Sequence, residues 1–214
     1  MPPSWRVTAR FVVILAAPLA GSAGGSALGV QGPADAANPV TAEFRVFDGT
    51  SEVSAAARLR VRPAGGDGDA LDVVGQRIEL APAMYDVQAL HEREGGVVAI
   101  KWAERLAVMH YPDEGGRHLE VINLQSGFGA LQLRATEGAL TPAEVTLFPA
   151  GDADTPAGQA ITGDDYVLFV VPAGPYDVRI EHADHGGSAD THWLLDVDVS
   201  ADRTRLTLVE TPGR

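Results

Sequence analysis

Residues 85–102 of the chain read YDVQALHEREGGVVAIKW, and residues 176–193 read YDVRIEHADHGGSADTHW. Seven positions are identical at one constant offset, without a gap, and one of them is a tryptophan, of which the chain has three. The identical residues are Tyr85, Asp86, Val87, His91, Gly95, Gly96 and Trp102, matched by Tyr176, Asp177, Val178, His182, Gly186, Gly187 and Trp193. A sequence that resembles itself at a fixed spacing indicates repeated structural units. We therefore predict that the chain is a duplication.

The similarity continues on both sides of these two stretches. The matching pairs are Arg58–Pro63 (RLRVRP) with Glu144–Pro149 (EVTLFP), and His118–Ile122 (HLEVI) with Arg205–Val209 (RLTLV). The first unit is predicted to span residues 41–125 and the second residues 126–214. Because the boundary at Gln125-Ser126-Gly127 is short, the two units are expected to touch.

Within each unit, apolar and polar residues alternate. Tyr176, Val178 and Ile180 are separated by charged residues, a pattern typical of strands with one face on a core and one in water. Segments rich in glycine, proline and aspartate lie between the strands and indicate turns. Only Ser51–Ala57 has the character of a short helix. The sequence thus predicts an all-β chain of two tandem antiparallel β-sandwiches, with Trp102 and Trp193 in their cores.

The segment Val171–Val178 (VPAGPYDV), together with Phe44–Pro63, resembles the transthyretin-like units called carboxypeptidase regulatory-like domains. In that family a Pro-Ala-Gly turn leads into an inner strand whose tyrosine packs at the edge of the sandwich. The resemblance implies transthyretin-like or immunoglobulin-like sandwiches that serve as non-catalytic accessory or adhesive modules of bacterial envelope proteins. The first unit departs from the motif at Met84. No functional residue is transferred by the resemblance.

The N-terminus has the features of a secretory signal. Arg6 and Arg10 precede the apolar run Phe11–Ala20, and small residues follow. This run is shorter than the roughly 20 residues that a membrane-spanning helix needs. We therefore predict a signal peptide and short linker in residues 1–36, no membrane span, and export to the periplasm or the extracellular space.

Composition restricts the chemistry. The chain carries 29 acidic and 16 basic residues, for a net charge of −13, and it contains no cysteine. Nucleic-acid binding is not expected, because it requires a basic surface. Disulfides, thiolate nucleophiles and cysteine-based zinc sites are excluded.

Three histidines lie close together in the second unit. His182, His185 and His192, with Asp190, are the candidate metal ligands, because imidazoles and a carboxylate suit Zn²⁺. The first unit has Lys101 in place of His192, so folding of this type of unit cannot require the metal. We expect neither a bound metal nor a cofactor; a metal-dependent enzyme or metal carrier using the histidine hairpin 182–192 is the alternative.

Two further groups were weighed as binding sites. The aspartate pairs in turn segments suit Ca²⁺, but they lack the spacing of a calcium loop and are expected to be solvated turns. These pairs are Asp67/Asp69, Asp152/Asp154 and Asp164/Asp165. The Tyr–Trp pair of each unit is expected to pack in the core, with a sugar-stacking platform as the alternative. Glu104 falls on an inward position, where a carboxylate is costly. Either the strand 102–110 carries a bulge, or Glu104 lies at the margin of the sheet beside an arginine.

No nucleophile-and-base arrangement or phosphate-binding loop is present in the sequence. The predicted function is therefore a non-catalytic exported accessory or binding module. Its expected partner is another protein of the cell envelope or a secreted protein, with carbohydrate as the alternative ligand.

We expect the exported protein to begin between Gly24 and Ala37, because cleavage sites follow small residues after the apolar run. Sequencing the N-terminus of protein recovered from an envelope fraction tests this. Protein starting at Met1 in that fraction would contradict the signal peptide.

Overall fold

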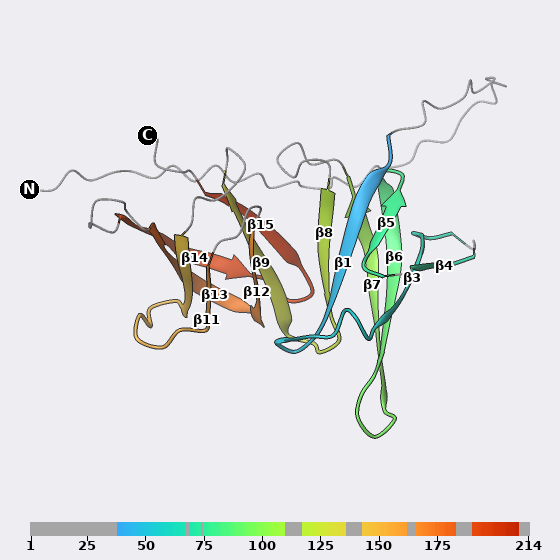
Figure 1. Ribbon diagram of the computed structural model, residues 1–214, viewed down its shortest axis with the longest axis horizontal. Helices are drawn as coiled ribbons and strands as arrows, with labels where there is room; N and C mark the ends of the chain where they lie inside the picture. Colours follow the sequence, from blue (N-terminus) through green and yellow to red (C-terminus); the bar gives the residue numbers. More distant parts are fainter. Residues whose placement is uncertain are drawn as a thin grey trace, which may run out of the picture. The chain divides into compact units, whose positions relative to one another are not determined.

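The described part of the chain folds entirely as β-strands and turns, which confirms the predicted all-β class (Figure 1). The computed structural model describes residues 38–66, 69–73, 75–109, 117–135, 143–161, 166–182 and 190–209. All of these residues belong to one compact unit, Asp35–Arg214. None of the residues in these ranges forms a helix that could cross a membrane.

The first repeat forms two sheets. Its strands are β1 (Val40–Asp48), β2 (Ser51–Glu52), β3 (Arg58–Pro63), β4 (Leu71–Val73), β5 (Arg77–Leu80), β6 (Ala83–Glu92), β7 (Val98–Val108) and β8 (Arg117–Asn123). Sheet A has the order β2-β1-β5, with β8 paired in parallel to β1, and sheet B has the order β4-β3-β6-β7. Ser51–Ala57 is not a helix, because its first two residues pair with the end of β1 and a turn follows.

The second repeat reproduces this arrangement. Its strands are β9 (Phe128–Ala135), β10 (Ala143–Pro149), β11 (Gly158–Ile161), β12 (Val167–Pro172), β13 (Gly174–His182), β14 (Asp190–Val199) and β15 (Thr204–Val209). Sheet C has the order β12-β9-β15 and sheet D the order β11-β10-β13-β14. Strands β15 and β9 pair in parallel, as β8 and β1 do, so the first and last strands of each repeat are neighbours.

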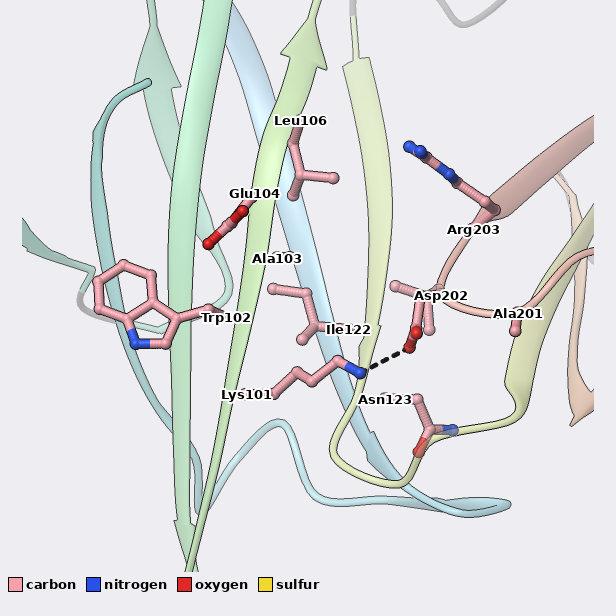
Figure 2. A pocket seen from close by; sticks show the side chains of 11 residues that line it. Lys101, Trp102, Ala103, Glu104, Leu106, Ile122, Asn123, Ala201, Asp202 and Arg203 are labelled. Carbon is pink, nitrogen blue, oxygen red and sulfur yellow. Dashed lines mark ion pairs between the residues drawn. The ribbon is translucent and has the colours of Figure 1, made fainter. Parts of the chain in front are cut away.

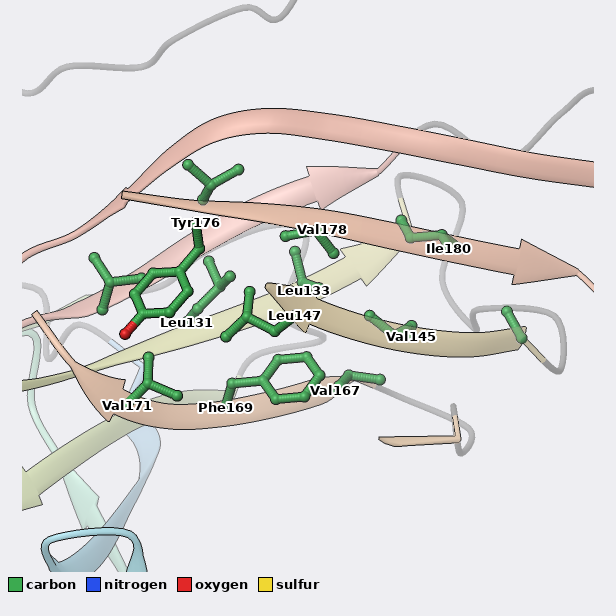
Figure 3. Packing of buried hydrophobic residues seen from close by; sticks show 13 residues of the cluster. Leu131, Leu133, Val145, Leu147, Val167, Phe169, Val171, Tyr176, Val178 and Ile180 are labelled. Atoms are coloured by element: carbon green, nitrogen blue, oxygen red, sulfur yellow. The ribbon is translucent and has the colours of Figure 1, made fainter. Parts of the chain in front are cut away.

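Each repeat has its own hydrophobic core. Alternate residues of β10 and β13, such as Leu147 and Ile180, point inward and meet Phe169 of β12 (Figure 3). In the first repeat Val61 and Val87 occupy the matching inward positions. Two separate cores agree with the predicted sandwiches. The boundaries of the two units, residues 41–125 and 126–214, stay a prediction.

The tyrosine of each repeat is buried, as the sequence predicted. Its hydroxyl donates a hydrogen bond to a carbonyl four residues earlier: Tyr85 to Ala81 at 2.8 Å and Tyr176 to Pro172 at 2.7 Å. Burial raises the pKa of both phenols. These bonds fix the turn that precedes the central strand in both repeats, although Pro82 lies three residues before Tyr85 and Pro172 lies four residues before Tyr176.

The aspartate after each tyrosine holds a bulge in the next strand. Asp86 accepts a hydrogen bond from the backbone N–H of Arg105 (3.1 Å), and Asp177 accepts one from that of Asp196 (3.0 Å). Arg105 and Asp196 have φ values of 56° and 55°, in the left-handed region that costs energy for side chains other than glycine. The strand register shifts next to both aspartates. The carboxylates therefore stabilise a strained residue in each repeat.

The bulge overturns the prediction that both tryptophans are core residues. Trp102 and Trp193 are each 40% exposed and lie on the outer side of their sheets. Beyond the bulge the inward positions of β14 shift by one residue, so Val197 and Val199 are buried while Leu195 is exposed. Glu104 is likewise exposed, which resolves its awkward position in favour of the bulge.

Removing the aspartate that holds the bulge of the first repeat should destabilise the fold. We expect Asp86→Ala to lower the free energy of unfolding by about 1–3 kcal/mol, because it leaves the N–H of the strained Arg105 without its part-buried acceptor. The matched control is Asp72→Ala, which removes an exposed ion pair with Arg60 and should cost less than about 1 kcal/mol. Urea unfolding followed by circular dichroism measures both, and equal losses would contradict the clamp.

Candidate binding faces on sheets B and D

The solvent side of sheet B, which we name face B, combines arginines, carboxylates and apolar side chains. Three arginines of β3 lie beside the outward residues of β6, and these lie beside a row on β7 that is apolar up to Trp102 and ends at Glu104. Face B consists of Arg58, Arg60, Arg62, Asp72, Asp86, Gln88, Leu90, Glu92, Val98, Ile100, Trp102 and Glu104. These side chains share one face because every second residue of a strand points to the same side.

An arginine holds the indole of Trp102 on face B. The guanidinium carbon of Arg62 lies 4.9 Å from the centre of the Trp102 ring. Nε of the same arginine lies 3.5 Å from the Asp86 carboxylate that clamps the bulge. A cation over an indole contributes about 0.5–1 kcal/mol at an exposed site. Trp102 is therefore held in place although much of its surface is open to solvent.

The solvent side of sheet D, which we name face D, matches face B in position but differs in composition. It carries two glutamates and one arginine, and its large exposed apolar residues number three, as on face B. Face D consists of Glu144, Thr146, Phe148, Gln159, Ile161, Arg179, Glu181, Thr191, Trp193 and Leu195.

Trp193 on face D is held by an aromatic ring. The centres of the Phe148 and Trp193 rings are 5.7 Å apart at an interplanar angle of 33°, and Phe148 itself is buried. The guanidinium of Arg179 lies 5.3 Å from the centre of the Phe148 ring. Both tryptophans are therefore packed against a neighbouring side chain. In the first repeat the arginine of β3 lies directly over the indole, whereas in the second the arginine of β13 lies over Phe148, which in turn contacts the indole.

Exposed apolar side chains concentrate on these two faces. Six of the ten large, exposed hydrophobic residues in the described ranges belong to face B or face D. They are Val98, Ile100, Trp102, Ile161, Trp193 and Leu195. Groups of exposed apolar residues rimmed by polar ones are typical of interaction surfaces. We therefore take face B and face D as the candidate functional sites.

A pocket of about 270 Å³ is lined by residues of β7, β8 and the turn before β15, with Trp102 and Glu104 among them (Figure 2). In it the ammonium of Lys101 forms a 2.8 Å ion pair with Asp202, and the side chain of Asn123 also lines the wall. Figure 2 shows Lys101 and Trp102 projecting to opposite sides of the strand. Lys101 is therefore already paired with Asp202.

The histidine candidates are only partly covered by the structure. In the backbone register His182 lies opposite Asp190, and His192 lies opposite Ile180. His185 and the side chains of His182 and Asp190 lie outside the described residues. Within the described ranges no group of three or more histidine, aspartate and glutamate side chains could hold a metal ion. The expectation that this hairpin binds no metal stays a prediction.

Asp152, in one of the aspartate-rich turn segments, stabilises its own turn. Asp152 accepts hydrogen bonds from the backbone N–H groups of Asp154 (3.0 Å) and Thr155 (3.1 Å), and these bonds lower the pKa of its carboxyl group. Such a bond pattern closes a turn. Asp67 and the pair Asp164/Asp165 lie outside the described residues.

A polar cluster that the sequence analysis missed fixes the β6–β7 hairpin. Both oxygens of Asp48 accept hydrogen bonds from Arg93, at 2.6 and 2.7 Å, and Gln125 donates a further one at 2.8 Å. The hydrogen bonds from Arg93, and then that from Gln125, hold the pKa of Asp48 below its ordinary value. Because that pKa is lowered on folding, this contribution to stability is present above the pKa of the unfolded chain and is lost as the pH falls.

The sequence analysis also missed the row of three arginines on face B, although the spacing of these arginines in the sequence indicates it. RLRVRP at 58–63 places arginine at every second position, which assigns all three to one side of a strand. Recognising the row as a surface needed the neighbouring Trp102, whose predicted burial was wrong.

Comparison with known proteins identifies no family. No protein-family model matches the chain, and no curated protein matches it. Among solved structures, the chain is similar to the Bacillus anthracis TIE protein (TM-score 0.29, 14% identity, 81% of this chain covered), of which it spans only 34%. It is also similar to a candidate adhesin from Bacteroides ovatus (TM-score 0.27, 11% identity, 91% of this chain and 100% of that one). A further match is a C-terminal fragment of the pilus adhesin SpaC from Lactobacillus rhamnosus GG (TM-score 0.24, 9% identity, 82% and 98%).

The half-exposed position of Trp193 predicts a modest contribution to stability. We expect Trp193→Ala to lower the free energy of unfolding by about 1–2 kcal/mol, mainly from the lost stack on Phe148. Ile180→Ala, in the core of the same repeat, should cost about 2–5 kcal/mol. Chemical denaturation compares the two, and a larger loss for Trp193→Ala would return this tryptophan to the core.

Proposed function

We propose that the protein is an exported, non-catalytic interaction module that binds a partner in the cell envelope through face B and face D. The observation that carries this proposal is the concentration of exposed apolar side chains on these two faces, each centred on a held tryptophan. A tryptophan fixed by its neighbours loses little freedom on binding, which suits a contact residue.

Two parts of the proposal rest on other residues. Export is inferred from the signal-like sequence of residues 1–36, which lie outside the described ranges. Assignment to transthyretin-like, carboxypeptidase regulatory-like units is supported by the buried tyrosines and their bonds to the Pro-Ala turn. The separate cores support two units at 41–125 and 126–214.

The test is co-sedimentation of the labelled protein with washed envelope fraction from the cells that make it. We expect binding, and we expect the double variant Trp102→Ala/Trp193→Ala to weaken it about tenfold or more, as the loss of contact tryptophans does. Leu71→Ala, an exposed apolar residue outside both faces, is the control and should bind like the unaltered protein.

Treatment of the envelope fraction then identifies the partner. Loss of binding after protease digestion indicates a protein, and loss after periodate oxidation indicates carbohydrate. Binding that is unaffected by the double tryptophan substitution would contradict the assignment of the faces.

A further inference from the structure

One row of side chains on face B crosses the sheet through its tryptophan. In the strand register Trp102 lies opposite Gln88, and Gln88 lies opposite Arg60. Arg60 in turn lies opposite Asp72. We name these four residues the Trp102 row. Neighbouring strands are roughly 4.8 Å apart, so the row extends over about 14 Å of the surface.

The charged members of the Trp102 row are open to solvent. The side chains of Arg60 and Asp72 are 54% and 74% exposed, although they form an ion pair at 2.9 Å. That pair joins Nε of the arginine to one carboxylate oxygen. A guanidinium has five N–H donors and a carboxylate has two oxygens, so both groups keep hydrogen-bonding capacity for a ligand.

The indole of Trp102 is held with part of its surface uncovered. The guanidinium of Arg62 lies over the ring, 4.9 Å from its centre, and Nε of that arginine is buried. The exposed part of Trp102, 40% of its surface, is the part that Arg62 does not cover. Because the indole is fixed before a ligand arrives, stacking on it costs little side-chain entropy.

An aromatic ring beside exposed polar groups is complementary to a pyranose ring. A pyranose presents C–H groups on its faces and hydroxyl groups around its rim. The C–H groups carry partial positive charge and pack on the electron-rich face of an indole. The hydroxyls donate and accept hydrogen bonds, so they can bond to the guanidinium, the carboxylate and the amide of the Trp102 row alike.

The charges of face B favour an uncharged glycan over a charged polymer or a protein. Its three arginines are set against four carboxylates, so the face has no strong net charge. Protein interfaces usually have few charged residues at their centre. On face B two arginine–aspartate pairs, at 2.9 and 3.5 Å, lie beside Trp102.

The matching row of face D is less suited to a glycan. It contains Trp193, Arg179, Thr146 and Gln159. Thr146 is buried, and Arg179 pairs with Glu181 at 3.3 Å. Part of the hydrogen-bonding capacity of this row is therefore used within the sheet.

We propose that face B binds an uncharged glycan of the cell envelope, with a pyranose ring stacked on Trp102 and its hydroxyls bonded to the polar members of the row. The proposal rests on the proposed function, because it names the chemistry of the partner of one of the two faces. Salt screens interactions between charges, and an uncharged ligand offers none. Binding is therefore expected to depend little on ionic strength.

Biolayer interferometry tests the proposal with polysaccharide from the envelope fraction as the probe. The polysaccharide is freed of protein and lipid by protease digestion and solvent extraction, and anion exchange separates its neutral part from its acidic part. The unaltered protein should bind the immobilised neutral polysaccharide equally well in low and in high salt. Trp102→Ala should weaken this binding about tenfold or more, as removal of a contact tryptophan does.

Two further variants accompany Trp102→Ala. Gln88→Ala removes one hydrogen-bonding group of the row and should weaken binding about three- to tenfold. It keeps the test decisive if Trp102→Ala fails to fold, which thermal melts by circular dichroism show. Leu71→Ala, an exposed apolar residue outside both faces, is the control and should bind like the unaltered protein.

Failure of the unaltered protein to bind the neutral polysaccharide would overturn the inference. So would binding that Trp102→Ala and Gln88→Ala leave unchanged, or binding that is confined to the acidic part and lost in high salt. If co-sedimentation with intact envelope fraction still depends on the tryptophans but is lost after protease digestion, the partner is a protein; only this inference then fails, and the proposed function stands. Binding that is independent of the tryptophans in both assays removes both.

Discussion

A hydrogen bond from a backbone N–H to one aspartate carboxylate decides which side of each repeat carries its tryptophan. Asp86 and Asp177 stabilise residues with left-handed backbone in the following strand, where a side chain other than glycine costs about 1 kcal/mol or more. The extra residue of the bulge interrupts the alternation of the strand. Leu106 and Val108 then face the core, while Trp102 faces solvent on the far side of the bulge. The composition of face B depends on this switch.

Alternation along the sequence predicted the core residues but not the bulge. Alternation of residues depends only on the local chain, so it correctly assigned Tyr176, Val178 and Ile180 to the core. The adjacent Tyr and Asp that recur in both repeats also indicated a shared structural role. The sequence did not reveal that the aspartate holds a bulge. The bulge depends on the hydrogen bond from the backbone of Asp196 to the side chain of Asp177, two residues that are 19 positions apart in the sequence. Alternation within β14 cannot reveal such a contact. The error at Trp193 has that physical origin.

The candidate sites were harder to predict than the fold. Apolar and aromatic residues in a strand are usually assigned to the core, because burial is their commonest state. An exposed tryptophan departs from that rule, and it is stabilised by Arg62 or Phe148 from a strand two positions away in the sheet. The arginine row was visible in the sequence, but a row of charges on a strand is ordinarily a solvated face. Its combination with Trp102 distinguishes it, and only the register of β3, β6 and β7 brings them together.

Duplication explains why the two faces could diverge while the cores did not. Inward residues such as Val61 and Leu147 are fully buried, and a change of volume there costs several kcal/mol. The outward residues Arg58 and Glu144 are not fully buried, so an arginine in one repeat can correspond to a glutamate in the other without loss of the fold. The tyrosine bond and the aspartate clamp are kept in both copies because each satisfies a buried or strained group. A duplicated sandwich can therefore present two surfaces of different composition on a common frame, with a tryptophan fixed at the same place in each.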